Sequence, residues 1–218
     1  MFKNALNLIY PNTCAICEKI NKLEICKKCE IELKKHFILQ IDKYKNKYFK
    51  EHLYIFKYEG IIRKKLIEYK FNNKPYLYKL FVKILNNSEK ICGFLIKYDI
   101  ITSVPMSRLK KNLRGYNQSE LIIKHLPNFT NKILFKIKNN SPQSELNRDN
   151  RIINVENVYV ARNIETIKNK KILIFDDIYT TGSTVNECSR ILKIAGAKEI
   201  GVLTIAKTKE EDEIKWRI

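Results

Sequence analysis

Two aspartates and a group of hydroxyl side chains lie within the nine residues from Asp176 to Thr184. Asp176 and Asp177 follow an apolar run, and Gly182 stands among the hydroxyl residues Thr180, Thr181, Ser183 and Thr184. Unpaired backbone N–H groups at the start of a helix suit a phosphate, and glycine allows close approach of the backbone. Carboxylates at a strand end can accept hydrogen bonds from a vicinal diol. The segment therefore predicts a site for a phosphorylated ribose.

Four cysteines form a second chemical cluster near the start of the chain. They are arranged as two Cys-x-x-Cys pairs, Cys14 with Cys17 and Cys26 with Cys29, with eight residues between the pairs. A short hairpin would bring the four thiolates together, and this spacing favours a structural, tetrahedral zinc ion. An iron–sulfur cluster or redox-active pairs remain alternatives. The other two cysteines, Cys92 and Cys188, are expected to be core thiols.

A strand, a helix and a second strand are needed to hold the aspartates and the hydroxyl loop in place. The continuous apolar run from Lys171 to Phe175 predicts a strand that is buried on both faces and ends at Asp176. A helix is expected to start near Ser183 or Thr184 and to close at Gly196, with a strand from Ile200 to Ala206 after it. This order is a right-handed βαβ unit, whose ligands bind at the carboxyl ends of the strands. The apolar stripe of the helix comprises Val185, Cys188, Leu192 and Ala195.

The whole chain is expected to divide into two units. Residues 1–50 contain the four paired cysteines and a lysine-rich stretch, Asp42 to Tyr48, which suggests a linker or an exposed helix. Residues 51–218 are expected to form a larger α/β domain. Within the larger domain, Tyr98 to Val104 reads as a strand and Gln118 to His125 as a helix. The polar, broken segment from Phe129 to Val160 is a candidate mobile hood.

The segment Ile172 to Thr184 resembles the signature of type I phosphoribosyltransferases, an apolar strand followed by Asp-Asp-x-x-Thr-Thr-Gly-x-Thr. Other blocks resemble the ComF/GntX family, which is associated with competence and DNA uptake. Those blocks are Val104-Pro105-Met106-Ser107-Arg108, Arg114-Gly115-Tyr116-Asn117-Gln118, Pro142-Gln143 with Leu146, Arg151 and Asn154, and Tyr58-Glu59-Gly60 with Lys70-Phe71. Together with the cysteines, the resemblance covers nearly the whole chain. Tyr116 and Lys136 depart from it, standing where the family more often has Phe and Arg.

The resemblance implies a parallel sheet flanked by helices, with a hood, plus a small N-terminal zinc ribbon. It also implies binding of phosphoribosyl pyrophosphate with Mg²⁺ and displacement at C1 of the ribose. Asp176 and Asp177 would then hold the ribose diol, and the loop from Thr180 to Thr184 the 5-phosphate. Arg108 and Arg114 are candidates for the pyrophosphate, because guanidinium groups match phosphate oxygens. The arginines Arg148 and Arg151 of the hood could close over the substrate.

Two classes of function remain open at the level of sequence. The first is a phosphoribosyltransferase enzyme, whose acceptor the sequence does not reveal. The second is a non-catalytic module that senses phosphoribosyl pyrophosphate or a nucleotide and binds single-stranded DNA or a partner in DNA uptake. Intact ligand residues favour binding under both interpretations.

The composition bears on the binding partners and the cellular location of the protein. The 218 residues include 42 Lys and Arg against 23 Asp and Glu, a formal net charge of +19. This excess attracts polyanions such as nucleic acid, although a compositional bias towards lysine would explain it equally well. No apolar run approaches the roughly 20 residues of a membrane span, and no secretion signal is evident at the start, so a cytoplasmic protein is expected. The three histidines, at positions 36, 52 and 125, lack partners at metal-ligand spacing.

Overall fold

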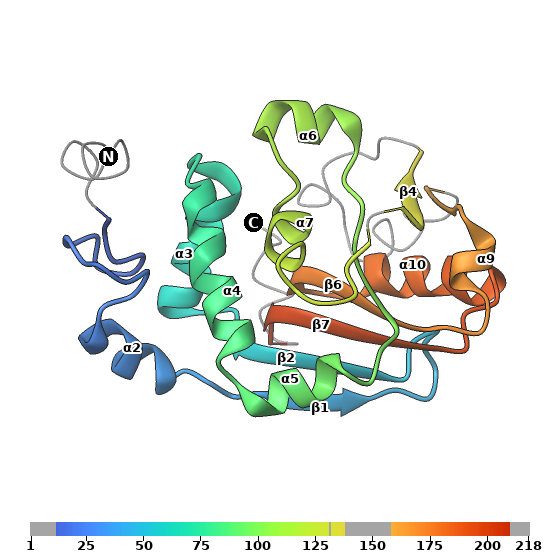
Figure 1. Ribbon diagram of the computed structural model, residues 1–218, viewed down its shortest axis with the longest axis horizontal. Helices are drawn as coiled ribbons and strands as arrows, with labels where there is room; N and C mark the ends of the chain where they lie inside the picture. Colours follow the sequence, from blue (N-terminus) through green and yellow to red (C-terminus); the bar gives the residue numbers. More distant parts are fainter. Residues whose placement is uncertain (1–11, 131, 138–157, 210–218) are drawn as a thin grey trace.

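The computed structural model describes residues 12–130, 132–137 and 158–209. At its centre is a five-stranded sheet in the order β1-β2-β7-β6-β3 (Figure 1). The strands are β1 (Gln40–Lys43), β2 (Glu51–Lys57), β3 (Ile100–Ser103), β6 (Lys171–Tyr179) and β7 (Glu199–Lys207). Strands β2, β7, β6 and β3 are parallel, and β1 pairs antiparallel with β2 at one edge. This arrangement confirms the α/β sheet expected from the sequence.

Both faces of the sheet are covered, because side chains of β6 alternate between two apolar clusters. Leu173 and Phe175 pack in the first cluster, while Ile172 and Ile174 pack in the second. The first cluster includes residues of α3 (Gly60–Phe71), η1 (Pro75–Leu77), α4 (Tyr78–Asn86), α5 (Glu89–Leu95) and α7 (Gln118–Ile123). The second includes residues of α9 (Ile164–Ile167), α10 (Ser183–Ile194) and the two-stranded sheet of β4 (Leu134–Lys136) and β5 (Tyr159–Ala161). The apolar run is thus buried on both sides, as its composition predicts.

The helix after the hydroxyl loop follows its predicted course. Helix α10 begins at Ser183, and all four residues of its predicted apolar stripe are buried. Gly196, just after the helix, has a φ of 92°, which is typical of a glycine that ends a helix. The preceding strand differs from expectation, because β6 continues past Phe175 to Tyr179 by pairing with β7 as far as Lys207. Asp176 and Asp177 therefore lie on the strand rather than after it.

The region of the candidate hood is described only in part. Its two ends form the antiparallel pair of β4 and β5, with Phe135 opposite Val160. Residues 138–157 lie outside the described residues, and so do Arg148 and Arg151. An additional helix that the sequence did not suggest, α6 (Arg108–Arg114), stands above the sheet in Figure 1 and has no buried residue.

The lysine-rich stretch after the cysteines forms no helix. It begins within the edge strand β1, where Asp42 pairs with His52 of β2 and its carboxylate lies 2.6 Å from Nζ of Lys207. Backbone pairing and this ion pair attach the stretch to the sheet, so the sheet begins before residue 51. The domain boundary at residue 50 remains a prediction. Within the described part of the chain, no helix is both long and apolar enough to cross a bilayer.

Candidate functional site

The residues of the Asp-Asp and hydroxyl motif are brought together at the carboxyl end of β6. Asp176 and Asp177 lie near the end of this strand, and the loop that follows leads directly into α10. Oγ1 of Thr181 accepts a hydrogen bond from the backbone N–H of Ser183 at 3.3 Å and lies 2.8 Å from Oγ of Ser183. The loop thus presents hydroxyl groups beside the start of a helix, where further backbone N–H groups point outwards. Thr180 is exposed, Gly182 is buried and Thr184 lies partly buried in the first turn of α10.

Asp176 is held by two donors. Its Oδ1 accepts a hydrogen bond from Oγ of Ser119 at 3.1 Å and another from the backbone N–H of Asp177 at 2.9 Å. Burial and the charge of Asp177 raise the pKa of Asp176 to about 7, although Lys70 and the two hydrogen bonds oppose the shift. A carboxylate that is costly to ionise becomes easier to ionise when a cation or hydroxyl donors reach it. Asp176 is therefore suited to a ligand that brings such groups.

Asp177 is held by a cation from a distant part of the sequence. Nζ of Lys70, near the end of α3, lies 2.8 Å from Oδ1 of Asp177, and the Asp177 side chain is only 7% exposed. An ion pair with so little exposure is screened much less than a surface pair. Lys70 thus offsets one of two adjacent negative charges and fixes the carboxylate against α3.

The glycine of the loop rests on an aromatic stack. Gly182 has a φ of 73°, and a Cβ at this position would collide with the ring of Tyr179. The Tyr179 ring in turn stacks on His52, with centroids 4.3 Å apart. His52 is buried, and its Nε2 lies 2.8 Å from Oγ1 of Thr204 on β7. Both its backbone conformation and its close neighbour therefore require glycine at position 182.

The two arginines proposed for the pyrophosphate lie at opposite ends of α6. Arg108 lines a cleft of about 520 Å³ that is also bordered by Ser103 at the carboxyl end of β3. Arg114 instead lies with its guanidinium carbon 4.8 Å from the centroid of the Phe71 ring and donates to Oε1 of Gln118 at 3.3 Å. The structure therefore associates Arg108 with a cleft and Arg114 with a contact between α3 and α7.

The sequence alone indicates no role for several residues that the structure places at the site. Lys70 belonged to a family block, but a single lysine among 42 Lys and Arg residues carries no signal for its carboxylate partner. Ser119 is the second residue of α7, and His52 lacks a metal-ligand partner in the sequence. Their contacts with Asp176 and Tyr179 depend on how the strands and helices pack.

The four paired cysteines converge on one point. Their Sγ atoms all lie within 4.8 Å of one another, and those of Cys17 and Cys26 are 4.0 Å apart. A tetrahedral zinc ion with Zn–S bonds of about 2.3 Å needs sulfur atoms about 3.8 Å apart, close to this spacing. Burial acts to raise the pKa of Cys14, but backbone N–H groups, including that of Cys26, lower it to about 6. The cluster can thus hold a metal ion. The backbone donors favour the thiolate of Cys14, whereas burial and the neighbouring cysteines raise the pKa of Cys29.

The lone cysteines behave differently from each other. Cys188 is fully buried in the second apolar cluster, as expected for a core thiol. Cys92 is only partly buried, and its Sγ lies 3.6 Å from the carbonyl oxygen of Asn86. The expectation of a core thiol is therefore met at Cys188 alone.

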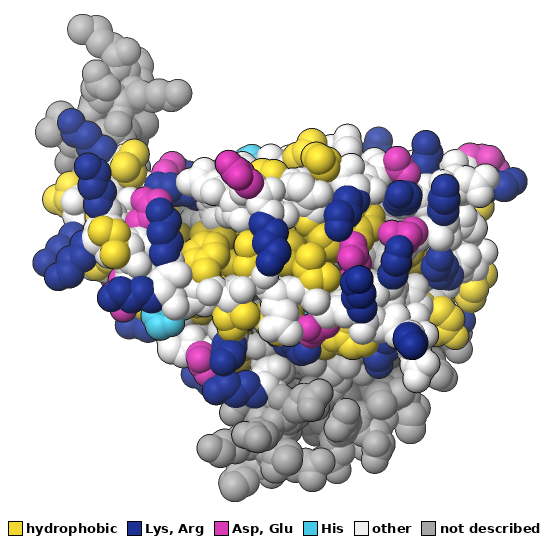
Figure 2. Space-filling model, turned by 90° about the horizontal axis from the view of Figure 1, so that it is seen from below, with side chains coloured by type: hydrophobic (Ala, Val, Ile, Leu, Met, Phe, Trp, Pro, Cys, Tyr) yellow, Lys and Arg dark blue, Asp and Glu magenta, His cyan; other side chains and the backbone are white. Residues whose placement is uncertain are grey.

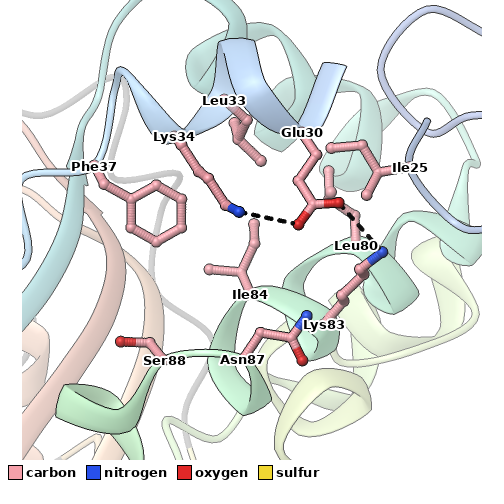
Figure 3. Close-up of a pocket in the computed structure, with 10 residues that line it drawn as sticks. All are labelled: Ile25, Glu30, Leu33, Lys34, Phe37, Leu80, Lys83, Ile84, Asn87 and Ser88. Carbon is pink, nitrogen blue, oxygen red and sulfur yellow. Dashed lines mark ion pairs between the residues drawn. The ribbon is translucent and has the colours of Figure 1, made fainter. Parts of the chain in front are cut away.

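The cysteine module packs against the main domain through α2 (Lys27–Lys34). A largely apolar hollow of about 260 Å³ lies between α2 and α4. Figure 3 shows how Glu30 reaches towards Lys34 and Lys83 at this hollow. Cys14, Ala15 and Ile25 belong to the same apolar cluster as α3 and α4. The module therefore shares its core with the helices that cover one face of the sheet.

A polar network also joins the module to α3. Glu18, next to Cys17, lies 2.6 Å from Nζ of Lys74 and 3.6 Å from Nζ of Lys65. Lys65 is buried and is also 2.9 Å from the carboxylate of Glu68. Because Lys70 lies on the same helix, the position of the cysteine module is physically connected to the Asp177 side of the site.

A comparison with known protein families matches the part of the chain that contains the motif. A family model described as phosphoribosyl transferase domain matches residues 118–218. Among solved structures, phosphoribosylpyrophosphate synthetase from Mycobacterium smegmatis is 14% identical with a TM-score of 0.34, over 61% of this chain and 33% of that chain. The sheet and the sequence match define a protein with a type I phosphoribosyltransferase fold.

Curated relatives narrow the family. "Competence protein ComFC" of Streptococcus pneumoniae is 31% identical over 156 residues, covering 72% of this chain and 68% of that protein. "Competence protein F" of Haemophilus influenzae is 32% identical over 116 residues, or 50% of each chain. "Competence protein ComFC" of Bacillus subtilis is 21% identical over 212 residues, covering 94% of this chain and 82% of that protein. The chain belongs to the ComF family of competence proteins.

Proposed function

We propose that this protein binds phosphoribosyl pyrophosphate with Mg²⁺ at the carboxyl end of β6. One observation carries the proposal: two adjacent carboxylates, Asp176 partly buried and Asp177 buried, lie beside a hydroxyl-rich loop that opens a helix of 12 residues. The loop suits a phosphate, and the carboxylates suit hydroxyl groups and a cation. A ribose 5-phosphate bears both kinds of group at the required ends.

The carboxylate pair fits a divalent cation. Mg²⁺ binds oxygen ligands, usually through one or two carboxylates, waters and substrate phosphates. Burial and then the charge of Asp177 raise the pKa of Asp176, and an approaching cation offsets both effects. Bound with the ligand, Mg²⁺ would offset the charge of the pyrophosphate.

Each part of the site would then have a distinct task. Asp176 and Asp177 accept hydrogen bonds from the ribose diol, and the loop from Thr180 to Thr184 donates to the 5-phosphate. Arg108 at the edge of the 520 Å³ cleft binds the pyrophosphate. In an enzyme these contacts position C1 for displacement and stabilise the charge that develops there.

The test is calorimetric titration of the wild-type protein with phosphoribosyl pyrophosphate and Mg²⁺, followed by incubation with a panel of acceptors. Binding in the titration supports the proposal, and its absence refutes it. Release of pyrophosphate that depends on an added acceptor would establish an enzyme. Binding without release under any acceptor would favour the sensing module instead.

We also propose that the ion held by the four cysteines is zinc. The all-thiolate donor set, with sulfur spacing close to tetrahedral, matches structural zinc sites. Elemental analysis of protein purified without chelators should give about one zinc per chain. Iron in its place would overturn the assignment.

Binding of single-stranded DNA is a second candidate function, supported by the net charge of +19 and by membership of a competence family. On the face shown in Figure 2, Lys and Arg are spread widely among apolar and a few acidic side chains. A distributed charge predicts little sequence preference and an affinity that falls steeply with salt. Fluorescence anisotropy with labelled oligonucleotides measures both, and no binding at low salt would reject this function.

A further inference from the structure

The 520 Å³ cleft beyond the end of β3 has two different walls. One wall comes from α6, with Arg108 and Lys111, and the other from β4 and the end of β5, with Phe135, Lys136 and Arg162. Clefts that bind small molecules are commonly about 300–1,000 Å³. The size is therefore sufficient for a small ligand beside a pyrophosphate.

The cleft carries an excess of positive charge. Of the residues that the structure describes, four cations line it against one carboxylate, Glu120, whose Oε2 lies 3.7 Å from Nζ of Lys111. Among residues 12–130, 132–137 and 158–209, no carboxylate forms an ion pair with Arg108, Lys136 or Arg162. Cations this close together repel one another, so a bound anion would stabilise the arrangement.

The β4–β5 wall combines this charge with aromatic surface. Phe135 supplies the ring that lines the cleft, and the guanidinium carbon of Arg162 lies 4.7 Å from its centroid. Nζ of Lys136 lies 5.5 Å from the centroid of the Tyr159 ring, which is itself buried behind the wall. Burial and the nearby Lys110 lower the pKa of Lys136, so its charge is poorly solvated. A guanidinium over a ring keeps N–H groups for a carboxylate, while its planar face and the ring suit a flat molecule.

The cleft adjoins the proposed phosphoribosyl site. Ser103, on its floor, pairs with Phe175 immediately before Asp176. Asn117, another lining residue, caps the helix whose Ser119 donates to Asp176. A molecule on the β4–β5 wall would thus lie next to a ribose held by Asp176.

We propose that Phe135, Lys136 and Arg162 bind a planar organic anion, a heteroaromatic carboxylate. The claim that this molecule is the acceptor for C1 of the ribose rests on the proposed function. The claim that it binds in the cleft does not. Among the described residues Lys136 and Arg162 have no carboxylate partner, and a neutral base would supply none. An inorganic anion would make no use of the Phe135 ring.

The test compares orotate and nicotinate with their neutral counterparts, uracil and nicotinamide, by calorimetric titration. In the wild-type protein the carboxylates should bind at least about tenfold more tightly, as charge-assisted hydrogen bonds require. Lys136→Gln and Arg162→Gln should each remove most of this preference and leave the weak binding of the neutral compounds unchanged. Lys132→Gln alters an exposed lysine just before β4 and should behave as wild type. Thermal unfolding confirms that each variant is folded.

Equal binding of charged and neutral compounds would overturn the inference. The inference would also be overturned if Lys136→Gln and Arg162→Gln lost binding of inorganic pyrophosphate but kept binding of the carboxylates. The β4–β5 wall would then bind the pyrophosphate. Titration of the same variants with phosphoribosyl pyrophosphate and Mg²⁺ separates the two proposals. If the wild type binds phosphoribosyl pyrophosphate without preferring carboxylates, only the inference fails; if it prefers carboxylates without binding phosphoribosyl pyrophosphate, only the proposed function fails.

Discussion

Nζ of Lys70, at the end of α3, lies 2.8 Å from Oδ1 of Asp177 on β6. The lysine supplies a positive charge beside two neighbouring carboxylates, and it lowers the pKa of Asp176 against the effects of burial and of Asp177. The charge state of the site therefore depends on a helix that is more than a hundred residues away in sequence.

Replacing Lys70 by Gln should raise the pKa of Asp176 further. An opposite charge close to a carboxylate shifts its pKa by about 1–3 units, so the pH midpoint of ligand binding should rise by about one unit. Titrations with phosphoribosyl pyrophosphate and Mg²⁺ at several pH values measure the midpoint. Lys64→Gln, an exposed change on the same helix, is the matched control. An unchanged midpoint in Lys70→Gln would show that the ion pair does not influence the site.

Ligand binding by the wild-type protein should be coupled to proton release. Below a pH of about 7 Asp176 holds a proton in the free protein, and the ribose diol requires the ionised carboxylate as acceptor. Affinity should therefore rise with pH up to about this value, by at most about tenfold per unit. Calorimetry in buffers of different ionisation enthalpy counts the protons released. The ligand phosphates also titrate, so the informative quantity is the difference from Asp176→Asn, and no difference would contradict the assignment.

The raised pKa of Asp176 should also make the stability of the free protein depend on pH. Its native state retains the Asp176 proton over a range in which the unfolded chain has lost it. The free energy of unfolding should therefore fall as pH rises from the ordinary carboxyl range, about 4, to about 7. Asp176→Asn should flatten this part of the profile in thermal unfolding experiments.

Gly182→Ala should damage the phosphate loop. Alanine at a φ of 73° is strained, and its Cβ would displace the Tyr179 ring from its place on His52. We expect a destabilisation of about 1–3 kcal/mol and a loss of at least about tenfold in ligand affinity. Gly93→Ala, in a helix with no atom near the added Cβ, is the control and should retain wild-type binding. Full affinity in Gly182→Ala would mean that the loop does not contact the ligand.

Cys14→Ser should release the metal and also lower the melting temperature of the main domain. The second effect follows because Cys14 and Ala15 share an apolar cluster with α3 and α4. Metal content and thermal unfolding measure the two effects, and Cys92→Ser, outside the cluster of four, should change the metal content little. Retention of one equivalent of metal by Cys14→Ser would contradict the four-cysteine site.

The sequence predicts three strands of the main sheet, β3, β6 and β7, together with the motif, because these depend on local patterns. The apolar run before Asp176 and the glycine-containing loop each specify a strand or a helix start within a few residues. The extension of β6 to Tyr179 was missed because it depends on pairing with β7, which the acidic residues of the strand do not suggest.

Contacts between distant segments could not be predicted in the same way. Lys70 and Ser119 reach the aspartates through the packing of α3 and α7 on the sheet. His52 supports Tyr179 from a strand more than a hundred residues earlier. The edge strand β1 was also missed, because its four residues carry little apolar signal and its place is fixed by pairing with β2.

Replacement of both Asp176 and Asp177 by Asn tests the central claim most directly. The change preserves size but removes two negative charges and the carboxylate acceptors of the ribose diol. Charge-assisted hydrogen bonds contribute roughly 1.5–3 kcal/mol each, so calorimetric titration with phosphoribosyl pyrophosphate and Mg²⁺ should show a loss of about tenfold to a thousandfold. Metal content and the melting profile should show that the variant is folded. Affinity equal to wild type in a folded double variant would contradict the placement of the ribose at the end of β6.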